Sequence, residues 1–71
     1  MYPNLNAEMA RRKLTWTYLA SRLGIRLGTL SQKQLGKVPF TLDEAISIKA
    51  VLEEVHELDM PLEELFKRED V

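Results

Sequence analysis

Apolar residues recur along this chain at spacings of three and four, the spacing of residues on one face of an α-helix. No segment alternates apolar and polar residues over a sustained stretch, so we expect no β-sheet. Three glycines and three prolines interrupt the helical pattern. The pattern therefore predicts an all-α fold of four to five short helices, in a single domain over residues 1–71.

The first helix is expected to begin after Asn4, a good N-cap that follows Pro3. Three consecutive cations, Arg11, Arg12 and Lys13, come near its end. They suit the negative end of the helix dipole. Contact with a DNA phosphate is the alternative role for the same three residues.

Residues 15–36 predict two helices that are joined by a glycine-marked turn. Thr15 is a good N-cap for the first of them. Gly24 stands where a left-handed residue would end that helix. Ala20 is small, which leaves room for a crossing helix. The segment therefore predicts a helix-turn-helix.

The second helix of this pair is predicted over residues 27–35 and stops at Gly36. Leu30 lies at the centre of its buried side. Gln34 falls on the same side, where an apolar residue is expected, and Leu35 falls nearer the outer face. The end of this helix is therefore where the pattern is least regular.

A capping box, Thr41 with Glu44, opens the next helix, which runs from Leu42 to Val55 or Leu58. The helix carries two apolar stripes. The first, expected to cover the helix-turn-helix, is Leu42, Ala45, Ile46 and Leu52. The second, expected to pack against the last helix or a second subunit, is Ile48, Val51, Val55 and Leu58.

The last helix is predicted from Pro61 to about Lys67, because proline fits the first turn of a helix. The C-terminal helices therefore span residues 42–67. The residues from Lys67 to Val71 are expected to fray.

Charge is distributed unevenly, although the formal net charge is only −1. Residues 1–40 contain seven Lys or Arg and one acid, whereas residues 41–71 contain three Lys or Arg and ten acids. This asymmetry indicates a face that meets a polyanion. An ordinary charged surface with an uneven distribution is the alternative interpretation.

Catalytic and metal chemistry has little support in these residues. The chain has no cysteine and one histidine, His56, which lies among acids on an expected exposed helix face. Neighbouring carboxylates diverge on a helix and do not form an acid–base pair. We therefore expect no enzyme activity, no metal, no cofactor and no small-molecule ligand. The absence of cysteine and of a long apolar run favours a cytoplasmic protein without a membrane segment.

Three segments carry a resemblance to a known family: LASRLGIRLGTLS from residue 19, GKVPFTLDEAISIK from residue 36 and MPLEELF from residue 60. The chain resembles the lambda-repressor/Cro-like, or XRE-type, helix-turn-helix domains, especially the short phage-associated regulators of Gram-positive bacteria. The resemblance implies a four- to five-helix lambda-repressor-like fold. It also implies a phage or prophage transcriptional regulator that binds operator DNA as a homodimer.

The resemblance implies contacts with double-stranded DNA by residues at the starts of the two helices and along the second. These are Trp16, Thr17, Arg26, Leu27, Gly28, Thr29, Gln32, Lys33 and Lys37. Only Gln32 among the matched base-reading positions has suitable chemistry, because glutamine can bond adenine N6 and N7. Lys37 matches a phosphate-contact position. Trp16 either donates to a phosphate or packs against the core.

A second function stays open, because the helix over residues 27–35 is poor in base-reading side chains. The same fold can serve as a protein-interaction module of an antitoxin-like or antirepressor-like kind, with weak or no DNA binding. In either case the homodimer is expected through the second stripe of the long helix.

Overall fold

The computed structural model describes residues 1–69, and this part of the chain contains five helices and no strand. The helices are α1 (Pro3–Arg11), α2 (Trp16–Leu23), α3 (Leu27–Gln34), α4 (Leu42–Val55) and α5 (Leu62–Leu65). The all-α, five-helix prediction is therefore confirmed. None of the described helices has the length and apolar composition needed to cross a membrane.

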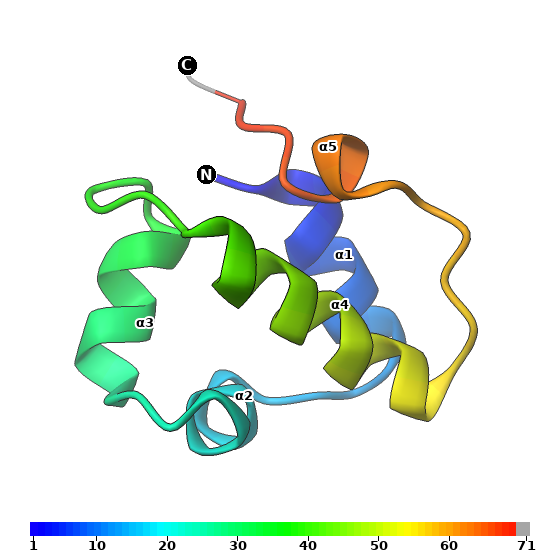
Figure 1. The fold of residues 1–71 in the computed structure, drawn as a ribbon, viewed down its shortest axis with the longest axis horizontal. Coiled ribbons are helices and arrows are strands. Elements are labelled where there is room, and N and C mark those ends of the chain that lie inside the picture. Colours follow the sequence, from blue (N-terminus) through cyan, green and yellow to red (C-terminus); the bar gives the residue numbers. More distant parts are fainter. Residues whose placement is uncertain (70–71) are drawn as a thin grey trace.

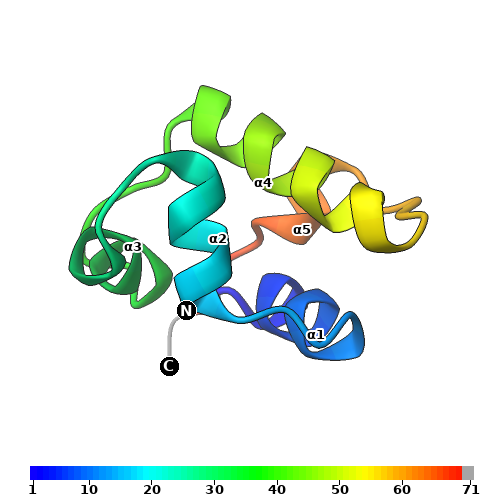
Figure 2. The same cartoon turned by 90° about the horizontal axis from the view of Figure 1, so that it is seen from below.

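The helices surround one apolar core (Figure 1). Seen from below, α4 and α1 lie on opposite sides of the molecule, with α2 between them and α3 at one edge (Figure 2). Every helix contributes at least one side chain with no measurable exposure: Leu5, Leu19, Leu30, Ile48, Leu52 and Leu65. Burial of apolar surface from all five helices is what stabilises so short a chain.

Each of the first three helices is followed within two residues by a residue with positive φ. These residues are Lys13 (φ 57°), Gly24 (φ 70°) and Gly36 (φ 84°). In the second case the N–H of Ile25 donates to the carbonyl of Ala20 at 3.1 Å, which closes the turn after the helix. The left-handed end predicted at Gly24 is confirmed. Gly36 likewise follows the end of α3.

The predicted start of the first helix is wrong. The helix begins at Pro3, where the missing N–H of proline costs no hydrogen bond. Asn4 lies inside the helix, and its side-chain Nδ2 donates to the carbonyl of Glu64 at 2.8 Å. Asn4 therefore ties α1 to α5 and does not act as a cap.

Three aromatic rings join the N-terminus, the loop before α4 and the end of α5. The ring of Tyr2 lies edge-on to those of Phe40 and Phe66, with centroids 5.2 and 6.0 Å apart. Tyr2 is 4% exposed. Such edge-to-face pairs add to the stability that burial alone provides. This cluster fixes the chain ends against the core.

The C-terminal residues are better held than the expected fraying implies. α5 is shorter than predicted and ends at Leu65. Beyond it, the guanidinium of Arg68 donates to the carbonyl of Gly36 at 3.2 Å. The N–H of Glu69 donates to the carbonyl of Met1 at 3.0 Å. Residues 70 and 71 of the expected frayed tail lie outside the described residues.

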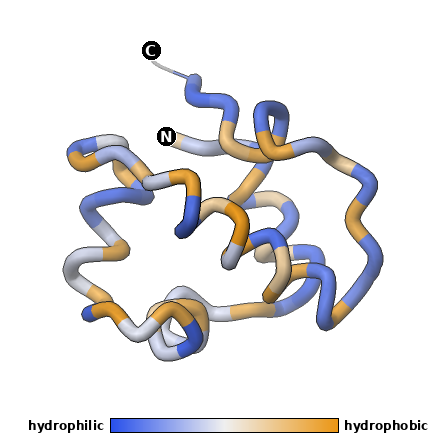
Figure 3. Tube along the Cα trace, in the orientation of Figure 1, coloured by the Kyte–Doolittle hydropathy of each residue, from blue (hydrophilic) through white to orange (hydrophobic). Residues whose placement is uncertain are grey.

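The two stripes of α4 are used partly as expected. In the first stripe, Ala45 and Leu52 are buried, whereas Leu42 and Ile46 are 69% and 51% exposed and do not cover the helix-turn-helix. In the second, Ile48, Val51 and Leu58 are buried within the single chain, and only Val55 is exposed. α2 and α5 both contact α4, in agreement with packing of the second stripe against the last helix. The second stripe is therefore not a free surface for a second subunit. Figure 3 shows the hydrophobic and hydrophilic positions mixed along α4.

Candidate nucleic-acid interface

α2 and α3 form a helix-turn-helix at one edge of the molecule. Thr15 caps α2, since its side-chain oxygen accepts from the N–H of Tyr18 at 3.1 Å. Ala20 and Leu30 are buried where the two helices meet the core, at 4% and 0% exposure. These local predictions are confirmed. They leave one side of α3 turned away from the other helices (Figure 1).

Most of the residues predicted to contact DNA lie on the surface. Seven of the nine are exposed: Thr17, Arg26, Leu27, Gly28, Thr29, Gln32 and Lys37. Trp16 is half-buried and packs against the core, in agreement with its packing role. Lys33 is the exception, because it is only 8% exposed.

Lys33 points inward, toward the first turn of α4. Its Nζ lies 2.7 and 2.8 Å from the two carboxylate oxygens of Glu44. The two side chains are 10% and 21% exposed, so water only partly screens the pair. The prediction that Lys33 is part of the DNA-facing surface is therefore wrong for this structure.

Glu44 binds Lys33 of α3 and also forms part of the N-terminal cap of α4. Its Oε1 also accepts from the N–H of Thr41 at 2.9 Å, and the Thr41 hydroxyl accepts from the N–H of Glu44, so the predicted capping box is confirmed. Burial alone would raise the pKa of Glu44. The hydrogen bonds from Lys33 and Thr41 and the positive charge of Lys33 outweigh burial and lower that pKa. The carboxylate therefore stays ionised at neutral pH.

The start of α3 is open to an anion. Arg26 occupies the N-cap position but makes no side-chain cap, and the first turn of α3 contains no acid. α4 and α5 differ, because each has two acids in its first turn. Residues 9–42 contain no Asp or Glu at all. No carboxylate from residues 9–42 therefore neutralises the positive end of the α3 dipole or accepts from the N–H groups at the start of α3.

Several of the cations in residues 1–40, the basic half of the chain, form ion pairs with carboxylates of the same chain. Arg11 and Arg12 pair with Glu8, and Arg22 with Glu54. The Arg22 guanidinium lowers the pKa of Glu54 through hydrogen bonds that outweigh desolvation. With Lys33 held by Glu44, four of the seven cations in residues 1–40 face carboxylates. Among the described residues, the cations of this half without such a partner are Lys13, Arg26 and Lys37.

Arg12 has a role that sequence reasoning missed. Its side chain is 2% exposed and makes five hydrogen bonds, one for each of its N–H groups. Three of them go to the last carbonyls of α4 and the loop after it, those of Leu52, His56 and Glu57. The i,i+4 spacing from Glu8 could have signalled the ion pair. Nothing local could have signalled the contact with α4.

Apolar side chains also lie exposed at α3 and just after it. Leu27, Leu35 and Val38 are 44%, 50% and 38% exposed. Leu35 lies near the outer face, as the sequence pattern predicted, and Gln34 is half-buried. The outer surface of α3 is therefore mixed, with isolated apolar groups beside Gln32 and two cations.

We compared the chain with protein-family models, curated proteins and solved structures, and nothing matches it. The resemblance to XRE-type domains therefore stays a prediction from the sequence.

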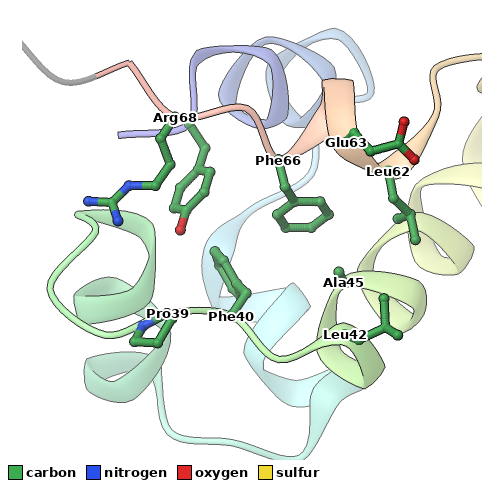
Figure 4. Close-up of a pocket in the computed structure, with 9 residues that line it drawn as sticks. Pro39, Phe40, Leu42, Ala45, Leu62, Glu63, Phe66 and Arg68 are labelled. Atoms are coloured by element: carbon green, nitrogen blue, oxygen red, sulfur yellow. The ribbon is translucent and has the colours of Figure 1, made fainter.

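A shallow pocket of about 430 Å³ lies between the loop before α4, the start of α4 and α5 (Figure 4). The rings of Tyr2, Phe40 and Phe66 line it, with Leu42 and Leu62 on the side of the helices. Its lining is mostly apolar.

Residues 1–69 contain no metal-binding site that the side chains would form. No group of three or more His, Cys, Asp or Glu side chains there could hold a metal ion. His56 is exposed, and its Nδ1 lies 3.2 Å from the carbonyl of Glu57.

Proposed function

We propose that this chain is a cytoplasmic, sequence-specific DNA-binding regulator that places the outer side of α3 in the major groove. The observation that carries the proposal is the chemistry of that side. It presents Arg26, Gln32 and Lys37 and an uncapped helix start whose first turn contains no acid. These are the groups that phosphates and base edges require.

Phosphate contacts would supply most of the affinity. The free N–H groups at the start of α3 and the cations Arg26 and Lys37 can each meet a phosphate oxygen. Gln32 is the residue proposed to read bases, through paired hydrogen bonds to adenine. Because Lys33 is held by Glu44, it is left out of the contact set.

Selection of bound duplexes from a random DNA pool tests this function. The proposal expects an enriched sequence, and it expects Gln32→Ala to lose preference at one adenine position while binding of other sequences persists. Two copies on one operator would give an inverted repeat with recognition helices about 34 Å apart. Homodimerisation itself stays a prediction from the resemblance, since the stripe first expected to carry it is buried.

A protein-interaction module is the second candidate, and the exposure of Leu27, Leu35 and Val38 favours it. Apolar groups of this kind can pack against a partner surface. If the same selection enriches no sequence and no duplex binds at low salt, this second function is the better account.

A further inference from the structure

Lys33 is the one cation within α3, and Glu44 holds it from the neighbouring helix. The ammonium bridges both carboxylate oxygens, at 2.7 and 2.8 Å. The carboxylate is itself fixed by the N–H of Thr41 at the start of α4. The ammonium therefore cannot leave without breaking two short charged hydrogen bonds in a largely buried site.

We propose that Glu44 limits the affinity of this protein for DNA of arbitrary sequence by keeping Lys33 away from the phosphates. The inference rests on the proposed DNA-binding function. A phosphate contact strengthens binding to every duplex alike, because phosphates carry no sequence information. A lysine on the recognition helix that pairs within the chain adds nothing to that general affinity.

The physical reason is the cost of an unpaired buried charge. In the native protein the Lys33 ammonium gives up most of its water, and the Glu44 carboxylate offsets this loss. Without the carboxylate, the flexible stem of lysine lets the ammonium turn out to solvent. There it can reach the same polyanion as Arg26 and Lys37.

Glu44→Gln separates the two roles of this residue. Glutamine keeps the size of the side chain and still serves in a capping box, so the start of α4 is preserved. Only the charge that holds Lys33 is lost. Glu53→Gln is the matched control, since Glu53 is exposed on the same helix and has no ion pair among the described residues. It changes the net charge equally but releases no cation.

The experiment measures binding of a random-sequence duplex as a function of salt for five proteins. These are wild type, Glu44→Gln, Glu53→Gln, Lys33→Gln and the double variant Glu44→Gln/Lys33→Gln. The inference expects Glu44→Gln to steepen the log–log salt slope by about 0.9, which is about a threefold greater loss of affinity for a fourfold rise in salt. The other three variants should keep the slope of wild type.

An unchanged slope in folded Glu44→Gln overturns the inference, and so does a steeper slope that persists in the double variant. If Glu44→Gln does not fold, Lys33→Gln alone still decides. Its slope should equal that of wild type, and a slope shallower by about 0.9 would mean that Lys33 already contacts phosphate. Wild type that binds no duplex overturns the proposed function, and this inference with it.

Discussion

The guanidinium of Arg12, at the end of α1, donates from its Nε to the carbonyl of Leu52, in the last turn of α4, at 2.9 Å. The last carbonyls of a helix have no partner within the helix. The Leu52 carbonyl already accepts from the N–H of His56, and Arg12 is its second donor, from 40 residues away. Arg12 also donates to the carbonyls of His56 and Glu57, just past the end of α4, and it brings a positive charge to the negative end of the α4 dipole. α4 has no basic residue in its own last turn.

Arg12→Ala should therefore destabilise the fold strongly. It would leave the Glu8 carboxylate buried without its closest cation, and it would remove the guanidinium donor from the carbonyls of His56 and Glu57. Breaking a buried pair of this kind costs about 3–5 kcal/mol. Urea denaturation followed by circular dichroism measures the change. The control is Arg11→Ala, whose side chain is 68% exposed and whose loss should cost less than about 1 kcal/mol. Equal effects of the two variants would contradict this role of Arg12.

Gly36→Ala and Gly28→Ala should change stability in opposite directions. Gly36 has φ 84°, and a Cβ there would lie 2.6 Å from Nη2 of Arg68, so alanine should cost about 1–2 kcal/mol. A Cβ at Gly28 meets nothing within 4 Å in a helical position, so alanine should stabilise by up to about 1 kcal/mol. Urea unfolding midpoints of the two variants, each compared with that of wild type, measure these changes. A destabilised Gly28→Ala would show that α3 needs the freedom of glycine.

Ile48→Ala and Ile46→Ala test which side of α4 is buried. Ile48 has no measurable exposure, so its truncation should cost about 2–5 kcal/mol. Ile46 is 51% exposed, and its truncation should fall within about 0.5 kcal/mol of wild type. A large loss at Ile46 that depends on protein concentration would instead reveal a second subunit on that side.

The ion pair between Lys33 and Glu44 should make stability depend on acid pH. The pKa of Glu44 is lower in the folded chain than in the unfolded chain. Its carboxylate therefore stabilises the fold at pH above the ordinary glutamate value of about 4.3, and that stability is lost as the pH falls through the folded pKa. Urea midpoints of wild type and Glu44→Gln should differ most near neutral pH and converge in acid. A difference that stays constant with pH would contradict this.

The sequence predicted those features that act within one or two helical turns. The left-handed end at Gly24 and the capping box of Thr41 and Glu44 are both of this kind. The contact of Arg12 with Leu52 joins residues 40 apart, so it could not be read from local spacing. The pattern also showed that α4 has two apolar stripes, but only the packed fold shows which members of each stripe are buried.

The distribution of charge along the sequence was a poor guide to the charge of the folded surface. The basic and acidic halves of the sequence suggested one face for a polyanion. In the fold these halves pack together, and α4 supplies the carboxylates that pair with Arg22 and Lys33. What is left for a polyanion at α3 is the smaller set of Arg26 and Lys37, together with the uncapped start of the helix.

Salt dependence of DNA binding tests the central claim most directly. The measurement is the affinity of wild type for its selected duplex, by fluorescence anisotropy, between about 50 mM and 200 mM salt. If Arg26 and Lys37 each neutralise a phosphate, the affinity should fall about 12-fold over this range. Lys37→Ala should reduce the log–log slope by about 0.9, whereas Lys49→Ala, on α4, should leave it unchanged. An affinity that stays flat as salt rises, or equal slopes for wild type and Lys37→Ala, would contradict DNA binding through this face of α3.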